Sequence, residues 1–132
     1  MAWNIRTSRQ VTPDLEILVH QVNVDVAPSI VLDAGAAVAD SNGELTMLAG
    51  TPLTKIGNQY VPWSPTSGAG GTPNGPILGI LLRTEKFPDS TAKSDLPSAM
   101  WNHGQWFRAD RIIGWASNQA AIKAALPTCK FS

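Results

Sequence analysis

The chain has 132 residues; 43% are hydrophobic, only 15% are charged, and ten basic residues balance ten acidic ones. A neutral chain has no net field that attracts nucleic acid or an anionic membrane, so we expect neither partner. The single cysteine, Cys129, excludes an internal disulfide and a cysteine-rich metal site. A chain of this length is one domain by default and can bury its own core. Its low charge favours a surface used in assembly.

The N-terminal region, residues 1–32, is predicted to be an extended arm that carries a β-strand. Residues 1–13 are polar, and residues 21–26 alternate apolar and polar side chains as a strand does. A strand that a small domain does not pair is an open edge, and open edges seek another chain. We therefore expect the arm, over residues 14–26, to add a strand to a partner. The side chains expected to make this contact are Leu15, Ile17, Val19, Val22, Val24 and Val26.

Residues 33–132 are predicted to form a compact domain of short strands. Asn42-Gly43 and Gly57-Asn58 each separate two apolar runs, the pattern of a tight hairpin. A loop over residues 64–76 contains four glycines and three prolines, and we expect packing to order it. Residues 77–82 are continuously apolar, which predicts the central buried strand.

The last third of the chain is predicted to contain one short helix between two strands. Residues 86–100 are expected to be a second irregular loop because they contain Pro88 and Pro97. A strand follows over residues 105–113. The helix is predicted over residues 118–126, capped by Ser117, and the tail at residues 129–131 returns as a strand. The apolar face of this helix is predicted to be Ala121, Ile122, Ala125 and Leu126.

The sequence contains no pattern typical of an active site. Only two histidines, His20 and His103, could serve a hydrolytic triad or a metal, and neither stands in a cluster of ligands. Carboxylates such as Glu85 with Asp89 or Asp110 could pair as in glycosidases, but neighbouring basic residues favour solvated ion pairs. We therefore expect no enzyme, no metal and no cofactor.

Four of the five tryptophans fall in the compact domain: Trp63, Trp101, Trp106 and Trp115. Tryptophan is enriched in cores and at interface hot spots. We expect some of the four to be core residues and at least one to reach an interface between subunits, so all four are candidates. A stacking platform for sugars is the alternative use of these rings.

The order of these features resembles the lambda-type bacteriophage head decoration proteins, also called capsid cement proteins. The matching residues are Thr51-Pro52-Leu53, Val61-x-Trp63, Ile77-Leu78-Gly79-Ile80-Leu81, Gly104-Gln105-Trp106-Phe107-Arg108 and Ile112-Ile113-Gly114-Trp115, followed by a short helix and an apolar strand. The resemblance covers about residues 49–132. The chain departs from the family in its longer N-terminal region and its longer 86–100 loop.

The resemblance implies a mainly β fold, a small barrel-like domain called a β-tulip, with one short C-terminal helix. It also implies a structural virion protein, made in the host cytoplasm, that forms homotrimers at three-fold and quasi-three-fold positions on the outer surface of the expanded head. There it would clamp neighbouring copies of the major capsid protein. The alternatives are another virion protein, at the base of a tail or head fibre, and a carbohydrate-binding module. If the arm anchors the protein, deleting residues 1–26 should leave a folded trimer that no longer binds heads.

Overall fold

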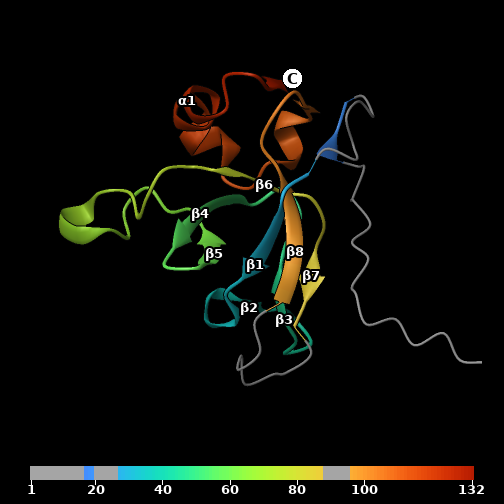
Figure 1. Cartoon of the computed structure of the whole chain (residues 1–132), viewed down its shortest axis with the longest axis vertical. Helices are drawn as coiled ribbons and strands as arrows, with labels where there is room; N and C mark the ends of the chain where they lie inside the picture. Colours follow the sequence, from blue (N-terminus) through green and yellow to red (C-terminus); the bar gives the residue numbers. More distant parts are fainter. Residues whose placement is uncertain (1–16, 20–26, 88–95) are drawn as a thin grey trace, which may run out of the picture.

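The computed structural model of this protein describes residues 17–19, 27–87 and 96–132. The fold is mainly β, as predicted, and its centre is a small closed barrel with strand order β1-β5-β4-β6-β8 (Figure 1). Two small sheets and one α-helix complete the described part. The barrel strands are β1 (Ser29–Leu32), β4 (Pro52–Ile56), β5 (Gln59–Pro62), β6 (Gly79–Leu81) and β8 (Leu96–Trp101).

The β4–β5 hairpin and strand β6 confirm two predictions. Gly57 has a φ of +64° at the tight turn between β4 and β5, where other residues would be strained. Strand β6 is buried along its whole length and pairs antiparallel with β4 on one side and β8 on the other. A strand covered on both faces needs the continuous apolar sequence seen at residues 77–82.

Two predictions about irregular segments were wrong. Strand β1 pairs parallel with β5 and antiparallel with β8, so it belongs to the barrel and not to an arm over residues 1–32. Strand β8 begins inside the predicted loop 86–100 and ends just beyond it at Trp101, and Pro97 is its second residue. The Pro97 side chain is exposed while Ser98 and Met100 are buried, so the strand tolerates a proline near its start.

The first small sheet has the order β2-β3-β7, and strand β2 is one of its edges. Its strands are β2 (Val38–Ala39), β3 (Leu45–Met47) and β7 (Glu85–Lys86). The predicted Asn42-Gly43 turn joins β2 to β3, with Gly43 at a φ of +78°. Asp40 Oδ1 accepts hydrogen bonds from the backbone N–H groups of Asn42 and Glu44, which fixes this turn.

The second small sheet pairs β9 (Trp106–Phe107) in parallel with β10 (Lys130–Phe131), which confirms the predicted last strand. Leu18 forms a β-bridge with Phe107 on the other side of β9. These segments and the helix α1 (Trp115–Ala125) lie together at one end of the barrel (Figure 1). The 3₁₀ turns of the described chain are η2 (Ala34–Ala36), η3 (Ala69–Gly71) and η4 (Ala109–Arg111).

Helix α1 starts two residues after Ile113, earlier than predicted. Its N-cap is Gly114, in the left-handed conformation, and not Ser117. The Asn118 side chain donates a hydrogen bond of 3.1 Å to the Gly114 carbonyl oxygen, which stabilises the early start. Of the predicted apolar face, Ile122 and Leu126 are buried, whereas Ala121 is exposed. In the described ranges, no helix has the length and apolar character needed to cross a bilayer.

Candidate interaction surfaces

The predicted arm contributes to the protein's own core at residues 17 and 18. Ile17 is 3% exposed and Leu18 is 6% exposed, and both pack in the cluster that contains Trp101 and Phe107. The backbone of this segment pairs with β9, because the Val19 N–H donates to the Trp106 carbonyl oxygen at 2.8 Å. The prediction that Ile17 contacts a partner was therefore wrong.

Val19 is 37% exposed and is the predicted arm residue that keeps an accessible surface in the described segment. The other predicted arm contacts lie outside the described residues: Leu15, Val22, Val24 and Val26. A deletion of residues 1–26 would remove Ile17 and Leu18 from the core, so it would not leave the fold intact. Any test of the N-terminal segment must end before Ile17.

Trp101 is one of the core tryptophans that we expected among the four, so it is no longer a candidate for a subunit interface. Its side chain has no exposed surface, and its ring centroid lies 6.2 Å from that of Phe107. Trp63 is half-buried, and its Nε1–H donates a hydrogen bond of 2.8 Å to the Gly75 carbonyl oxygen. Trp63 therefore keeps some accessible surface, but its polar edge is used within the chain.

Trp106 and Trp115 are half-buried at the end of the barrel that carries β10. The Trp106 ring has the Lys130 ammonium 5.5 Å from its centroid and donates through Nε1 to the Ser132 hydroxyl at 2.7 Å. The Trp115 ring stacks on Phe131 at 5.0 Å and has the Lys123 ammonium 5.6 Å from its centroid. A sugar-stacking platform needs an open ring face, and these contacts weigh against it.

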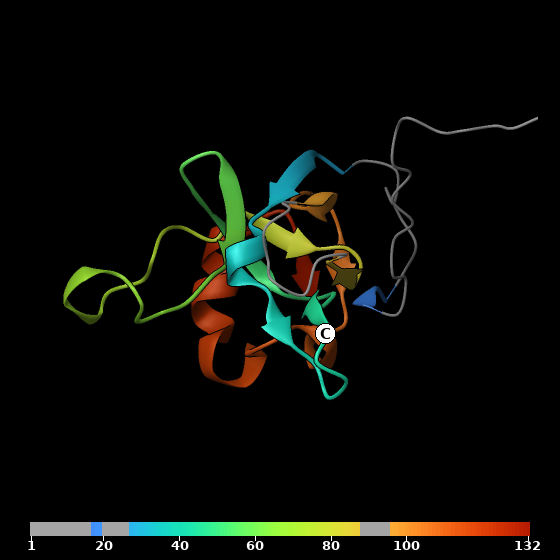
Figure 2. The ribbon, with the colours of Figure 1, turned by 90° about the horizontal axis from the view of Figure 1, so that it is seen from below.

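A projecting loop, residues 64–76, extends from the barrel between β5 and β6 (Figure 2). Two residues close its neck. The Ser64 N–H donates to Asn74 Oδ1 at 2.9 Å, and the Asn74 N–H donates to the Ser64 carbonyl oxygen at 3.1 Å. Asn74 Nδ2 also donates to the Pro62 carbonyl oxygen at 3.2 Å, which ties the neck to β5.

The tip of the projecting loop is held by its own hydrogen bonds. The Gly68 N–H donates to the Thr72 carbonyl oxygen at 2.8 Å, and the Thr72 hydroxyl donates to the Ala69 carbonyl oxygen at 2.7 Å. Residues 69–73 are exposed, and no residue from 64 to 76 is charged. The loop thus presents a neutral tip that hydrogen bonds hold in place, and not the packing that the sequence led us to expect.

An apolar groove runs along the edge strand β2 and has a volume of about 350 Å³. Val38, Leu48 and Ile113 line it and are 69%, 52% and 47% exposed, so its apolar side chains face solvent. A second hollow of about 270 Å³ continues from it, because Leu48 and Ile113 line both. The other residues of this second hollow are Ile17, Ala49, Thr84, Asp110 and Arg111.

Glu85 is the titratable residue whose position differs most from the sequence expectation. It was expected in a solvated ion pair, but its side chain has no exposed surface. The Ser98 hydroxyl donates a hydrogen bond of 2.6 Å to Glu85 Oε2, and Arg83 Nε lies 3.8 Å from Oε1. A period of two could have identified this burial, because Glu85 and Phe87 share one face of a strand and Phe87 is apolar.

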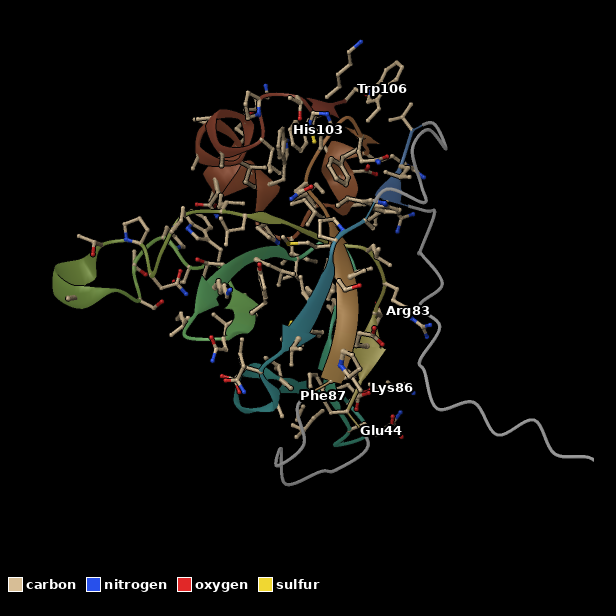
Figure 3. All side chains as sticks on the ribbon, viewed as in Figure 1. Glu44, Arg83, Lys86, Phe87, His103 and Trp106 are labelled. Carbon is tan, nitrogen blue, oxygen red and sulfur yellow. The ribbon has the colours of Figure 1, made fainter. Side chains whose placement is uncertain are left out.

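The exposed His103 lies apart from Glu85, at the end of the molecule that carries Trp106 and away from Lys86, the neighbour of Glu85 in β7 (Figure 3). His20 and Asp89 are outside the described residues. Across residues 17–19, 27–87 and 96–132, no three histidine, cysteine or acidic side chains gather as a metal site would need. Comparison with protein families and with curated proteins found no match.

Proposed function

We propose that this chain is a capsid decoration protein of the lambda type. It forms homotrimers at the three-fold and quasi-three-fold positions of an expanded bacteriophage head and clamps neighbouring copies of the major capsid protein. It acts from the outer surface of the virion through shape and non-covalent contacts, so its task needs neither a catalytic group nor a cofactor.

The first support is that residues which carry the family resemblance lie buried in the core of the domain. Leu53 on β4 and both Ile80 and Leu81 on β6 have no exposed surface, and these strands are neighbours in the barrel. Phe107 of the fourth motif is equally buried and stacks on Phe131 of the last strand, with ring centroids 5.5 Å apart. Residues that match in sequence therefore also fix the shape of the domain.

The observation that carries the proposal is the projecting loop. An element that extends from a rigid barrel and is already ordered loses little conformational entropy when it binds. Its uncharged tip offers backbone groups and shape rather than ionic contacts, which suits repeated contact with an identical lattice. In this proposal the tip of the loop contacts the capsid protein, and the barrel is the rigid body that holds the loop in place.

The test compares the full chain with Asn74→Ala on purified expanded heads. Asn74→Ala removes both side-chain hydrogen bonds of the neck, so the loop should lose its fixed position while the barrel stays folded. We expect about tenfold weaker binding to heads, which corresponds to ~1.4 kcal/mol. Faster hydrogen exchange over residues 65–73 should accompany the loss. The control is Gln119→Ala, on the exposed face of α1.

The outcomes separate the role of the loop from the function itself. Binding of the full chain to heads, with knobs at three-fold positions by electron microscopy, supports decoration. Full binding by Asn74→Ala would remove the loop from the contact. No binding of the unmodified chain to expanded heads would overturn the proposed function, and binding to glycans instead would favour the carbohydrate-binding alternative.

A further inference from the structure

The apolar groove leaves a set of hydrophobic side chains uncovered in the described part of the protein. Val38, Leu48 and Ile113 line it, and they are three of the six large hydrophobic side chains exposed among the described residues. Met47 lies beneath them at 4% exposure, so the groove opens onto the core. Contiguous exposed apolar surface of this kind marks a binding site rather than a random surface feature.

The described chain begins beside this groove. Ile17 lines the hollow that continues from the groove, so residues 1–16 join the described fold at that point. At about 3.3 Å per residue, such a segment reaches up to about 50 Å when extended. Residues 1–16 are therefore long enough to run through both hollows from where they join Ile17.

The chemistry of this N-terminal segment matches that of the groove. Its two arginines, Arg6 and Arg9, lie within residues 1–13, whereas its two acidic residues, Asp14 and Glu16, lie at its other end, next to Ile17. Asp40 is the charged residue that lines the hollow beside β2, and its carboxylate can accept a basic partner in addition to the backbone N–H groups of its own turn. Large apolar side chains suited to the groove are spread along the segment: Met1, Trp3, Ile5, Val11 and Leu15.

We propose that residues 1–16 dock in the apolar groove of their own chain and cover Val38, Leu48 and Ile113. The edge of β2 lies along the groove and can pair with an extended segment. The short connection at Ile17 gives the segment a high effective concentration at this site, which favours the same chain over a second copy. The inference goes beyond the proposed function because it concerns the protein free of any capsid.

The test places a photo-crosslinking amino acid at residue 5 of the full chain, in place of Ile5, and irradiates the purified protein without heads. We expect crosslinks within one chain to peptides that contain Val38, Leu48 or Ile113. Leu48→Asp should lower the yield about tenfold, because it puts a charge where apolar contact is needed. Ile56→Asp is the matched control, since Ile56 is also 52% exposed and does not line the groove.

Each outcome decides the proposal. Crosslinks between chains, seen as dimers in a mixture of light and heavy isotopes, would assign the groove to a second copy and overturn docking within the chain. Crosslinks elsewhere, none at all, or equal yields from the two aspartate variants would also overturn it. If Leu48→Asp fails to fold by circular dichroism, Val38→Asp replaces it, because Val38 is 69% exposed. Head binding is measured separately, so the two proposals fail independently.

Discussion

Ser98 on β8 donates a hydrogen bond of 2.6 Å to the buried carboxyl group of Glu85 on β7. The two strands belong to different sheets, because β8 is part of the barrel and β7 is part of the small sheet with β2 and β3. This bond therefore joins the small sheet to the barrel through polar atoms inside the protein. The small sheet also carries the β2 edge of the apolar groove, so the bond helps to position that surface.

Replacing Ser98 with alanine should destabilise the protein. The change removes the hydroxyl donor and leaves Glu85 Oε2 without this partner in a site that has no exposed surface. A buried polar atom that loses its partner costs about 1–3 kcal/mol. Urea unfolding followed by circular dichroism measures this loss.

Ser117→Ala is the matched control for Ser98→Ala, because Ser117 is exposed on α1. A surface substitution of this kind changes the free energy of unfolding by no more than about 0.5 kcal/mol. Equal unfolding free energies for the two variants would show that the bond between β7 and β8 contributes nothing to stability.

Local signals in the sequence predicted the parts of the fold that depend on local geometry. Gly43 and Gly57 both lie at tight turns with positive φ, and a glycine next to an asparagine between two strands indicates such a turn whatever surrounds it. Strand β6 was predictable because burial on both faces demands a continuous apolar run.

Long-range pairing decided the parts that the sequence did not predict. Strands β1 and β8 pair with each other over all four residues from Ser29 to Leu32, although more than sixty positions separate them along the chain. Proline at position 97 indicated a loop locally, but the pairing with β1 overrides this preference. The projecting loop was predicted as an ordered segment, whereas the apolar groove was not, because its Ile113 comes from a segment far along the chain from Val38 and Leu48.

A column of aromatic rings connects helix α1 to the core, and it yields the second prediction. Phe131 stacks on Trp115 at 5.0 Å and on Phe107 at 5.5 Å, with interplanar angles of 25° and 20°. Phe131→Leu keeps an apolar side chain but loses both ring contacts. Since each aromatic pair adds about 0.5–1.5 kcal/mol beyond burial, we expect a loss of about 1–3 kcal/mol in thermal or urea unfolding.

Phe87→Leu provides the comparison for Phe131→Leu. Phe87 is 5% exposed and packs in the other core cluster, with Met47 and Leu81 among its neighbours. Both variants lose similar apolar volume, but Phe131→Leu alone should change the near-ultraviolet circular dichroism that arises from Trp115. An unchanged tryptophan signal in Phe131→Leu would contradict the stacked column.

The third prediction concerns the exposed ion pair between Lys86 on β7 and Glu44, whose charged atoms lie 2.9 Å apart. The hydrogen bond and the charge of Glu44 raise the pKa of Lys86 above its ordinary value of 10.5, and Asp40 adds to this effect. A lysine whose pKa is higher in the folded state than in the unfolded state stabilises the fold below the unfolded-state value. That contribution disappears as the pH rises through the folded-state value.

Glu44→Gln should therefore lower the melting temperature slightly at pH 7 and leave it unchanged well above pH 10.5, where Lys86 is neutral in both proteins. The effect at pH 7 is small because both side chains are more than half exposed, and 1 M salt should reduce it further. Melting curves of the two proteins between pH 7 and pH 11.5 measure the difference, and titrating groups that they share cancel in it. A difference that grows with rising pH would show that Glu44 stabilises the fold through a contact other than Lys86.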